Sequence, residues 1–148
     1  MNTEKEVMMN SKPYFDVYFS CWPTPSEDDV YSSLLAQEVL KVLASAGFEV
    51  FAAHLVPWVI DRREETASWQ LLVLEKSSVL LVYAGKECLW TGIEIAFAYF
   101  LGMPIVIFQE TNGQRLDARL DNIITSVINY NNTRALKEPL LFVVNEVT

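Results

Sequence analysis

The chain has 148 residues, 51% of them apolar, and a formal net charge of −8. This length fits a single domain, residues 1–148, and the apolar content suffices for one core, which excludes a largely disordered chain. The acidic balance disfavours binding to DNA or RNA polymers, because their phosphate backbones are repelled, but it still permits a single bound nucleotide.

Strand and helix patterns alternate along the chain. Aromatic, β-branched or short apolar runs predict strands at residues 14–20, 48–53, 77–83, 104–108 and 140–144. Helical periodicity predicts helices at residues 29–46, 63–76, 90–101 and 116–129. This order favours an α/β fold, a flavodoxin/Rossmann-like three-layer sandwich whose five-stranded parallel sheet has the strand order 2-1-3-4-5.

The first twelve residues, the two cysteines and the single histidine argue against a metal centre and against a secretory signal peptide. Residues 1–12 are polar and are expected to form a flexible leader, since they lack the apolar core of a signal peptide. Cys21 and Cys88 show no CxxC spacing and His54 is the single histidine, so we expect neither a metal site nor a disulfide framework. Reduced thiols and a cytoplasmic location are the default expectation.

One apolar segment, residues 89–108, has the length of a membrane span. The turn residues Gly102, Met103 and Pro104 interrupt it, and it contains a glutamate. A buried helix, a turn and a buried strand explain it better, so no membrane association is expected.

The predicted topology indicates where a ligand would bind. In such sheets ligands bind beyond the carboxyl ends of the strands, where the strand order reverses between the first and third strands. The loops at that point, residues 20–26 and 84–90, carry Trp22 and Trp90. Both offer stacking surfaces for a flat ring such as a nucleobase, although large aromatics more often belong to a core or an interface.

Glu94 is the single charged residue of the predicted helix 90–101. Burying an ionised carboxylate without partners costs several kcal/mol, so its presence needs a reason. Its side chain leans towards the N-terminus of the helix, at the mouth of the predicted pocket. We interpret Glu94 as a nucleophile or general base; the structural alternative is that it binds first-turn N–H groups or pairs with an arginine.

Three segments carry a resemblance to a known family. Residues 18–23 look like its opening strand, and residues 91–106 look like its threonine-x-x-glutamate segment, which ends in a glycine-lysine-proline turn. Asn122 and the isoleucines after it are similar to a late helix whose asparagine or serine reaches the pocket of a neighbouring subunit. On these residues the chain resembles the nucleoside 2-deoxyribosyltransferase family, which includes nucleotide N-glycosidases.

The resemblance implies an enzyme that cleaves or transfers the N-glycosidic bond of a (deoxy)nucleoside or nucleotide. Glu94 would attack C1′ of the sugar, and a second base or water would release the covalent intermediate. No cofactor or metal is implied, and the partner expected besides the small-molecule substrate is a second copy in a homodimer or larger homo-oligomer. The residues of the same chain that would bind the substrate are Tyr18, Ser20, Trp22, Gly85 and Thr91. Asn122 would be contributed by a partner subunit.

The chain also departs from the family pattern. Ser77 and Ser78 stand where an aspartate usually precedes the third strand, and residues 88–91 replace an aspartate-x-glycine-threonine motif. In the family those aspartates hold sugar hydroxyls or help to protonate the leaving base. Their loss favours the alternative of a catalytically impaired module that binds a nucleotide derivative. A third alternative is an oligomeric structural subunit with a vestigial pocket.

Overall fold

The structure is a computed structural model, and the residues that it describes are 14–20, 30–52, 55–56, 63–83, 89–110, 118–131 and 135–148. Several residues singled out from the sequence lie outside these ranges: the expected leader, Cys21, Trp22, His54, Gly85 and Cys88.

A parallel sheet forms the middle layer of the structure. Its strands are β1 (Phe15–Ser20), β2 (Val50–Ala52), β3 (Ser77–Tyr83), β4 (Ile105–Glu110) and β5 (Ser126–Tyr130). Every neighbouring pair is parallel and the order is β2-β1-β3-β4-β5. The predicted fold class is therefore confirmed. The order 2-1-3-4-5 is also found, but its fifth strand is Ser126–Tyr130 and not the predicted residues 140–144. The reversal between β1 and β3 places Ser20, the last residue of β1, opposite Val82.

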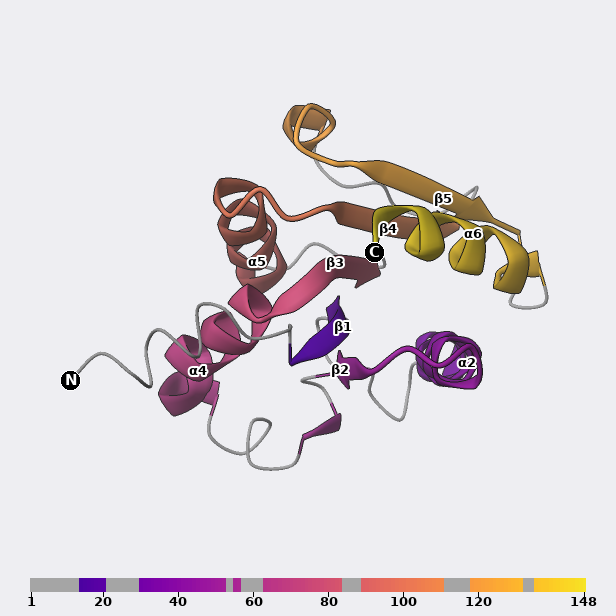
Figure 1. The fold of residues 1–148 in the computed structure, drawn as a ribbon, viewed down its shortest axis with the longest axis horizontal. Coiled ribbons are helices and arrows are strands. Elements are labelled where there is room, and N and C mark those ends of the chain that lie inside the picture. The colour runs from indigo at the N-terminus through magenta and orange to yellow at the C-terminus, as the bar shows by residue number, and fades with distance from the viewer. Residues whose placement is uncertain are drawn as a thin grey trace.

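Helices cover both faces of the sheet, as Figure 1 shows. One face packs against α2 (Val30–Ser45) and α6 (Lys137–Val147), and the other packs against α4 (Arg63–Glu75) and α5 (Leu89–Phe100). Side chains alternate along each strand. In β1, Phe19 therefore points into the α2–α6 layer, whereas Tyr18 belongs to the core cluster of the α4–α5 layer.

The last third of the chain differs from the prediction. Residues 116–129 do not form one helix: they contain the short 3₁₀ helix η2 (Ala118–Leu120), a turn and most of strand β5. The β-branched run of β5 pairs with β4, and the backbone of Ile105 exchanges hydrogen bonds with Thr125 at the start of that pairing. A cross-strand partner therefore overrides the helical spacing of the apolar residues in this segment.

The predicted strand 140–144 is instead part of helix α6. Leu136, Leu140 and Val144 recur every four residues and are fully buried against the α2 side of the sheet. Pro139 lies in the first turn, where a backbone N–H has no intrahelical acceptor, so it does not interrupt the helix. A short apolar run does not by itself distinguish a buried strand from a helix.

The segment with the length of a membrane span is divided as the sequence predicts. Its first part is α5 and its last part is β4, with a turn at Gly102 between them. Within the described ranges, no helix has both the length and the apolar character needed to cross a bilayer.

Gly102 closes α5 with a left-handed backbone (φ 71°), and the N–H of Met103 then donates to the carbonyl oxygen of Ala98 at 3.0 Å. We predict that Gly102→Ala lowers the free energy of unfolding by about 1 kcal/mol, because a Cβ disfavours this conformation. Denaturant unfolding measures the change.

Gly92→Ala is the matched control within the same helix. Gly92 has no positive φ, and an added Cβ there would meet no atom within 4 Å. Alanine should therefore raise stability at this position by roughly 0.5–1 kcal/mol. Equal effects of the two substitutions would contradict the assignment of strain to Gly102.

Candidate functional site

Glu94 lies on the face of α5 that packs against the sheet, and its exposed fraction is 0%. The helix places it there because Thr91, Ile95 and Ala98 are buried on the same face, at spacings of three and four residues. Glu94 is thus a carboxyl group within the apolar core of the α4–α5 layer, and it is more deeply buried than the pocket mouth that the sequence predicts.

Ser20 is the direct partner of this carboxyl group. Its hydroxyl donates a hydrogen bond to Oε1 of Glu94 with an O···O distance of 2.6 Å, across 74 positions of sequence. The serine is itself fully buried at the carboxyl end of β1. The parallel strand order therefore brings the end of β1 to the first turns of α5, where the topology predicts a ligand site.

Four further polar atoms at this site are buried without a hydrogen-bond partner. They are Oε2 of Glu94, the hydroxyl oxygen of Tyr18, Nε1 of Trp90 and Oγ1 of Thr91. Buried polar groups in folded proteins are nearly always paired, so a cluster of unpaired ones is unusual. Such a cluster is suited to a polar ligand that supplies the missing partners.

The spacing of these residues explains their convergence. Trp90 and Thr91 precede Glu94 by four and three residues, so the three side chains share one face of α5. Tyr18 points towards the same helix because it alternates with Phe19 along β1. Strand β1 and helix α5 together therefore supply every polar group of the site that the structure describes.

Burial controls the protonation of Glu94. Desolvation raises its pKa to about 7, while the Ser20 hydroxyl, the Tyr18 hydroxyl and the Trp90 indole N–H act in the opposite direction. The last two groups face the carboxyl group without the geometry of a hydrogen bond. Burial, followed by the charge of Glu94, raises the pKa of Tyr18 far above its usual range, so its hydroxyl stays protonated and can donate.

The residues expected from the sequence fall into three groups. Tyr18, Ser20 and Thr91 lie with Glu94, whereas Trp22 and Gly85 are outside the described residues. Asn122 is exposed in the turn after η2, so the late helix expected around it is not formed. Nothing in this single chain places Asn122 at the carboxyl group, and its role across a subunit contact remains a prediction.

Trp90 has a contact that we did not predict from the sequence. We interpreted its ring as a stacking surface, which stays a prediction, and the structure shows that its buried N–H faces the Glu94 carboxyl group. The sequence feature that indicates this contact is the position of Trp90 four residues before Glu94, because residues at that spacing share one face of a helix. In the described part of the chain, no three His, Cys, Asp or Glu side chains gather as a metal site would require.

Comparisons with known proteins show the fold. No family model matches the sequence, and no curated protein matches it either. The solved CMP N-glycosidase BcmB of Clostridium botulinum has 16% identity and a TM-score of 0.63, over 86% of this chain and 98% of that one. The 2-deoxyribosyltransferase of Bacillus psychrosaccharolyticus has 17% identity and a TM-score of 0.61, over 82% of this chain and 90% of that one.

The raised pKa of Glu94 predicts a pH-dependent stability effect of Glu94→Gln. In the unfolded chain the group ionises near 4.5, and in the folded chain near 7, so the folded state binds more protons between these values. Native stability therefore falls as the pH rises through this window. Glutamine should match the native protein below about pH 4.5 and exceed its free energy of unfolding above pH 7, by up to about 3 kcal/mol.

Denaturant unfolding at pH 4.5, 6 and 8 measures this difference, with Glu146→Gln as the control. Glu146 is exposed on α6, so the control removes one negative charge from the acidic chain without changing the core. Equal pH dependence of the two variants would show that the overall charge, and not the burial of Glu94, is responsible.

Proposed function

We propose that this chain is an N-glycosyl transferase or hydrolase acting on nucleosides or nucleotides, with Glu94 as its nucleophile. The observation that carries the proposal is the buried, unpaired Oε2 of Glu94, whose other oxygen accepts a hydrogen bond from Ser20. The two solved neighbours support it, since one is described as an N-glycosidase and the other as a deoxyribosyltransferase.

In the proposed reaction, the ionised Oε2 of Glu94 attacks C1′ of the bound sugar. A carboxylate–sugar ester bond forms, and the C1′–N bond breaks with its electron pair moving to the base, which takes up a proton. Water or a second base then attacks C1′ from the opposite face and releases Glu94. Two displacements at one carbon give overall retention of configuration.

The surrounding groups have matching roles in this proposal. Ser20 and Tyr18 orient the carboxyl group and stabilise its ionised form, because both hydroxyls lower its pKa. The buried, unpaired hydroxyl of Thr91 is available for a sugar hydroxyl. Trp22 and Gly85 remain proposed substrate-binding residues, since each follows a strand whose carboxyl end lies at the reversal of strand order. The proposed chemistry uses no cofactor.

We predict that native protein releases free base from at least one member of a panel of ribo- and deoxynucleosides and their 5′-monophosphates. Each compound is incubated with and without a second base, and the products are separated by chromatography. Glu94→Gln should reduce release at least about 1,000-fold, because the nucleophile is lost while the buried volume is preserved. Dependence on the second base distinguishes a transferase from a hydrolase.

Ser20→Ala is the companion variant in this assay. It should keep measurable activity but move the rising limb of the pH–rate profile to higher pH, because the hydroxyl that lowers the pKa of Glu94 is gone. Base release that persists in Glu94→Gln would exclude Glu94 as the nucleophile.

A second candidate function is a module that binds a nucleotide derivative without turnover. The complete burial of Glu94 favours it, since burial raises the pKa and reduces the ionised fraction that is able to attack. The replacement of the family's aspartates by Ser77, Ser78 and residues 88–91 favours it too. Retained ligand binding in a panel that yields no free base would support this alternative.

We further propose that the chain forms a homodimer or larger homo-oligomer through α5. The helix exposes an apolar surface: Leu89 is 85% exposed and Phe100 86% exposed, with Ile93 and Tyr99 between them. Its single charged residue, Glu94, is buried. Copies with a net charge of −8 repel one another, so a helix surface without charges is the most favourable place for them to meet.

We predict that Phe100→Glu reduces the molar mass in solution to that of a monomer, because it introduces a charge into this surface. Size-exclusion chromatography with light scattering measures the mass. Phe142→Glu is the control, since Phe142 is also an exposed phenylalanine (64%) but lies on α6. A monomeric native protein, or equal dissociation of both variants, would contradict the proposed interface.

A further inference from the structure

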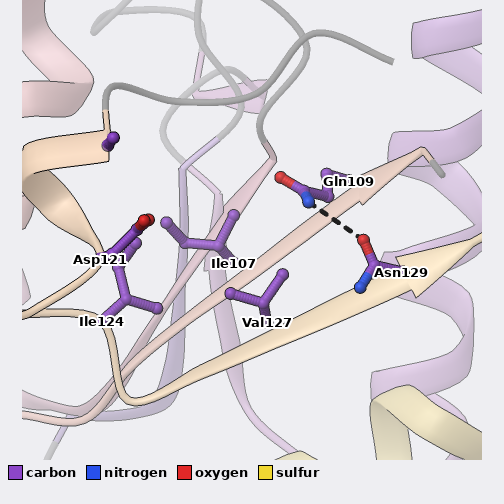
Figure 2. A pocket seen from close by; sticks show the side chains of 7 residues that line it. Ile107, Gln109, Asp121, Ile124, Val127 and Asn129 are labelled. Atoms are coloured by element: carbon purple, nitrogen blue, oxygen red, sulfur yellow. Dashed lines mark hydrogen bonds between the residues drawn. The ribbon is translucent and has the colours of Figure 1, made fainter. Parts of the chain in front are cut away.

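A hollow of about 330 Å³ lies over strands β4 and β5, and we call it the β4–β5 hollow. Its lining residues are Ile107, Gln109, Ala118, Asp121, Ile124, Val127 and Asn129. Figure 2 shows the labelled ones on β4, on β5 and on the turn that leads into β5, while Ala118 begins η2. None of them is among the polar groups that face Glu94.

The position of the hollow follows from the topology. Ile107 and Ile124 belong to the core of the α4–α5 face, so the hollow opens on that face beside α5. A doubly wound sheet usually has a full crossover helix between its strands. The described residues supply η2 and a turn before β5, while α6 packs on the opposite face.

A pair of side-chain amides forms one wall of the hollow. Nε2 of Gln109 donates to Oδ1 of Asn129 at 3.0 Å, and these residues are cross-strand partners. The bond uses one donor of the glutamine and one lone pair of the asparagine. Figure 2 shows the Gln109 carbonyl oxygen and the Asn129 nitrogen turned away from the bond, which leaves an acceptor and a donor for a ligand.

Burial and the hydrogen bond hold Gln109 in place. Gln109 is 8% exposed, whereas Asn129 is exposed at the rim of the hollow, and the bond between them fixes the orientation of the glutamine amide group. The two amide groups keep part of their hydrogen-bonding capacity unused at this wall of the hollow. The rest of the wall is mainly aliphatic, from Ile107, Ile124 and Val127.

The negative charge at and around the hollow disfavours an anionic ligand. Asp121 provides the one charged side chain of the lining, and the chain as a whole carries −8. A carboxylate beside the hollow opposes an anionic ligand, whereas a neutral group that has both a donor and an acceptor matches the amide pair. The volume lies within the range of small-ligand sites in proteins.

We propose that the β4–β5 hollow is a second binding site, for a small uncharged carboxamide or lactam with an apolar body. The amide edge of the ligand pairs with Gln109 and Asn129, and its body contacts the aliphatic wall. The site is independent of Glu94 and of the proposed glycosyl chemistry, because it shares none of the residues that act there.

Benzamide is the probe and benzoate its matched anionic control, since the two differ mainly in the group that would meet the amide pair. In ¹H–¹⁵N spectra of the native protein, benzamide should shift the side-chain NH₂ signals of Gln109 and Asn129, with a dissociation constant on the order of a few millimolar or tighter. Benzoate should bind at least about tenfold more weakly. Benzylamine tests whether Asp121 alone is the recognition element.

Val127→Trp should abolish the benzamide shifts by filling the hollow, and it is expected to fold because Val127 is 46% exposed. Val127→Ala leaves the hollow open and should bind within about threefold of the native protein. The proposal is overturned by absent shifts, by shifts that persist in Val127→Trp, or by tighter binding of benzoate or benzylamine than of benzamide. Shifts confined to Ser20 and Thr91 would overturn it too.

Discussion

The contact between Ser20 and Glu94 is the constraint around which the α4–α5 side of the molecule is arranged. It joins the carboxyl end of β1 to the first turns of α5, and both side chains are fully buried. An ionised carboxyl group is tolerated at such a place only where donors surround it, and the serine, tyrosine and tryptophan donors all face this one group. Strands β1 and β3 are parallel neighbours, and α5 follows β3. This arrangement therefore provides the electrostatic environment of Glu94 as well as its position.

This environment is a compromise between stability and chemistry. Burial raises the pKa of Glu94 to about 7, which opposes ionisation, while the surrounding donors reduce that rise. Tyr18 and Trp90 direct their donors at Glu94, and the buried Thr91 hydroxyl has no hydrogen-bond partner. A protein that needed only stability would place an apolar residue at position 94. The cost of the carboxyl group is the physical reason to regard this site as functional.

The solved neighbours have the same fold at 16% and 17% identity, so the architecture is common to them while most side chains are not. A fold can serve several functions, and function depends on the residues of the site. Here a serine, a tyrosine and a tryptophan face the Glu94 carboxyl group. The exposed apolar residues of α5 and the lining of the β4–β5 hollow include none of the side chains that face Glu94.

The sequence by itself determined the alternation of strands and helices as far as β4, the parallel α/β fold class and the exceptional character of Glu94. These features depend on local periodicity, on Gly102 as a helix end and on the cost of a charge within an apolar helix. Only the tertiary structure decided the types of the last two elements, because residues 126–130 pair with β4 and Leu136, Leu140 and Val144 bury against the sheet. It also decided that Trp90 turns its N–H to Glu94 and that Asn122 is exposed. Such outcomes depend on contacts between residues distant in sequence, which no local pattern contains.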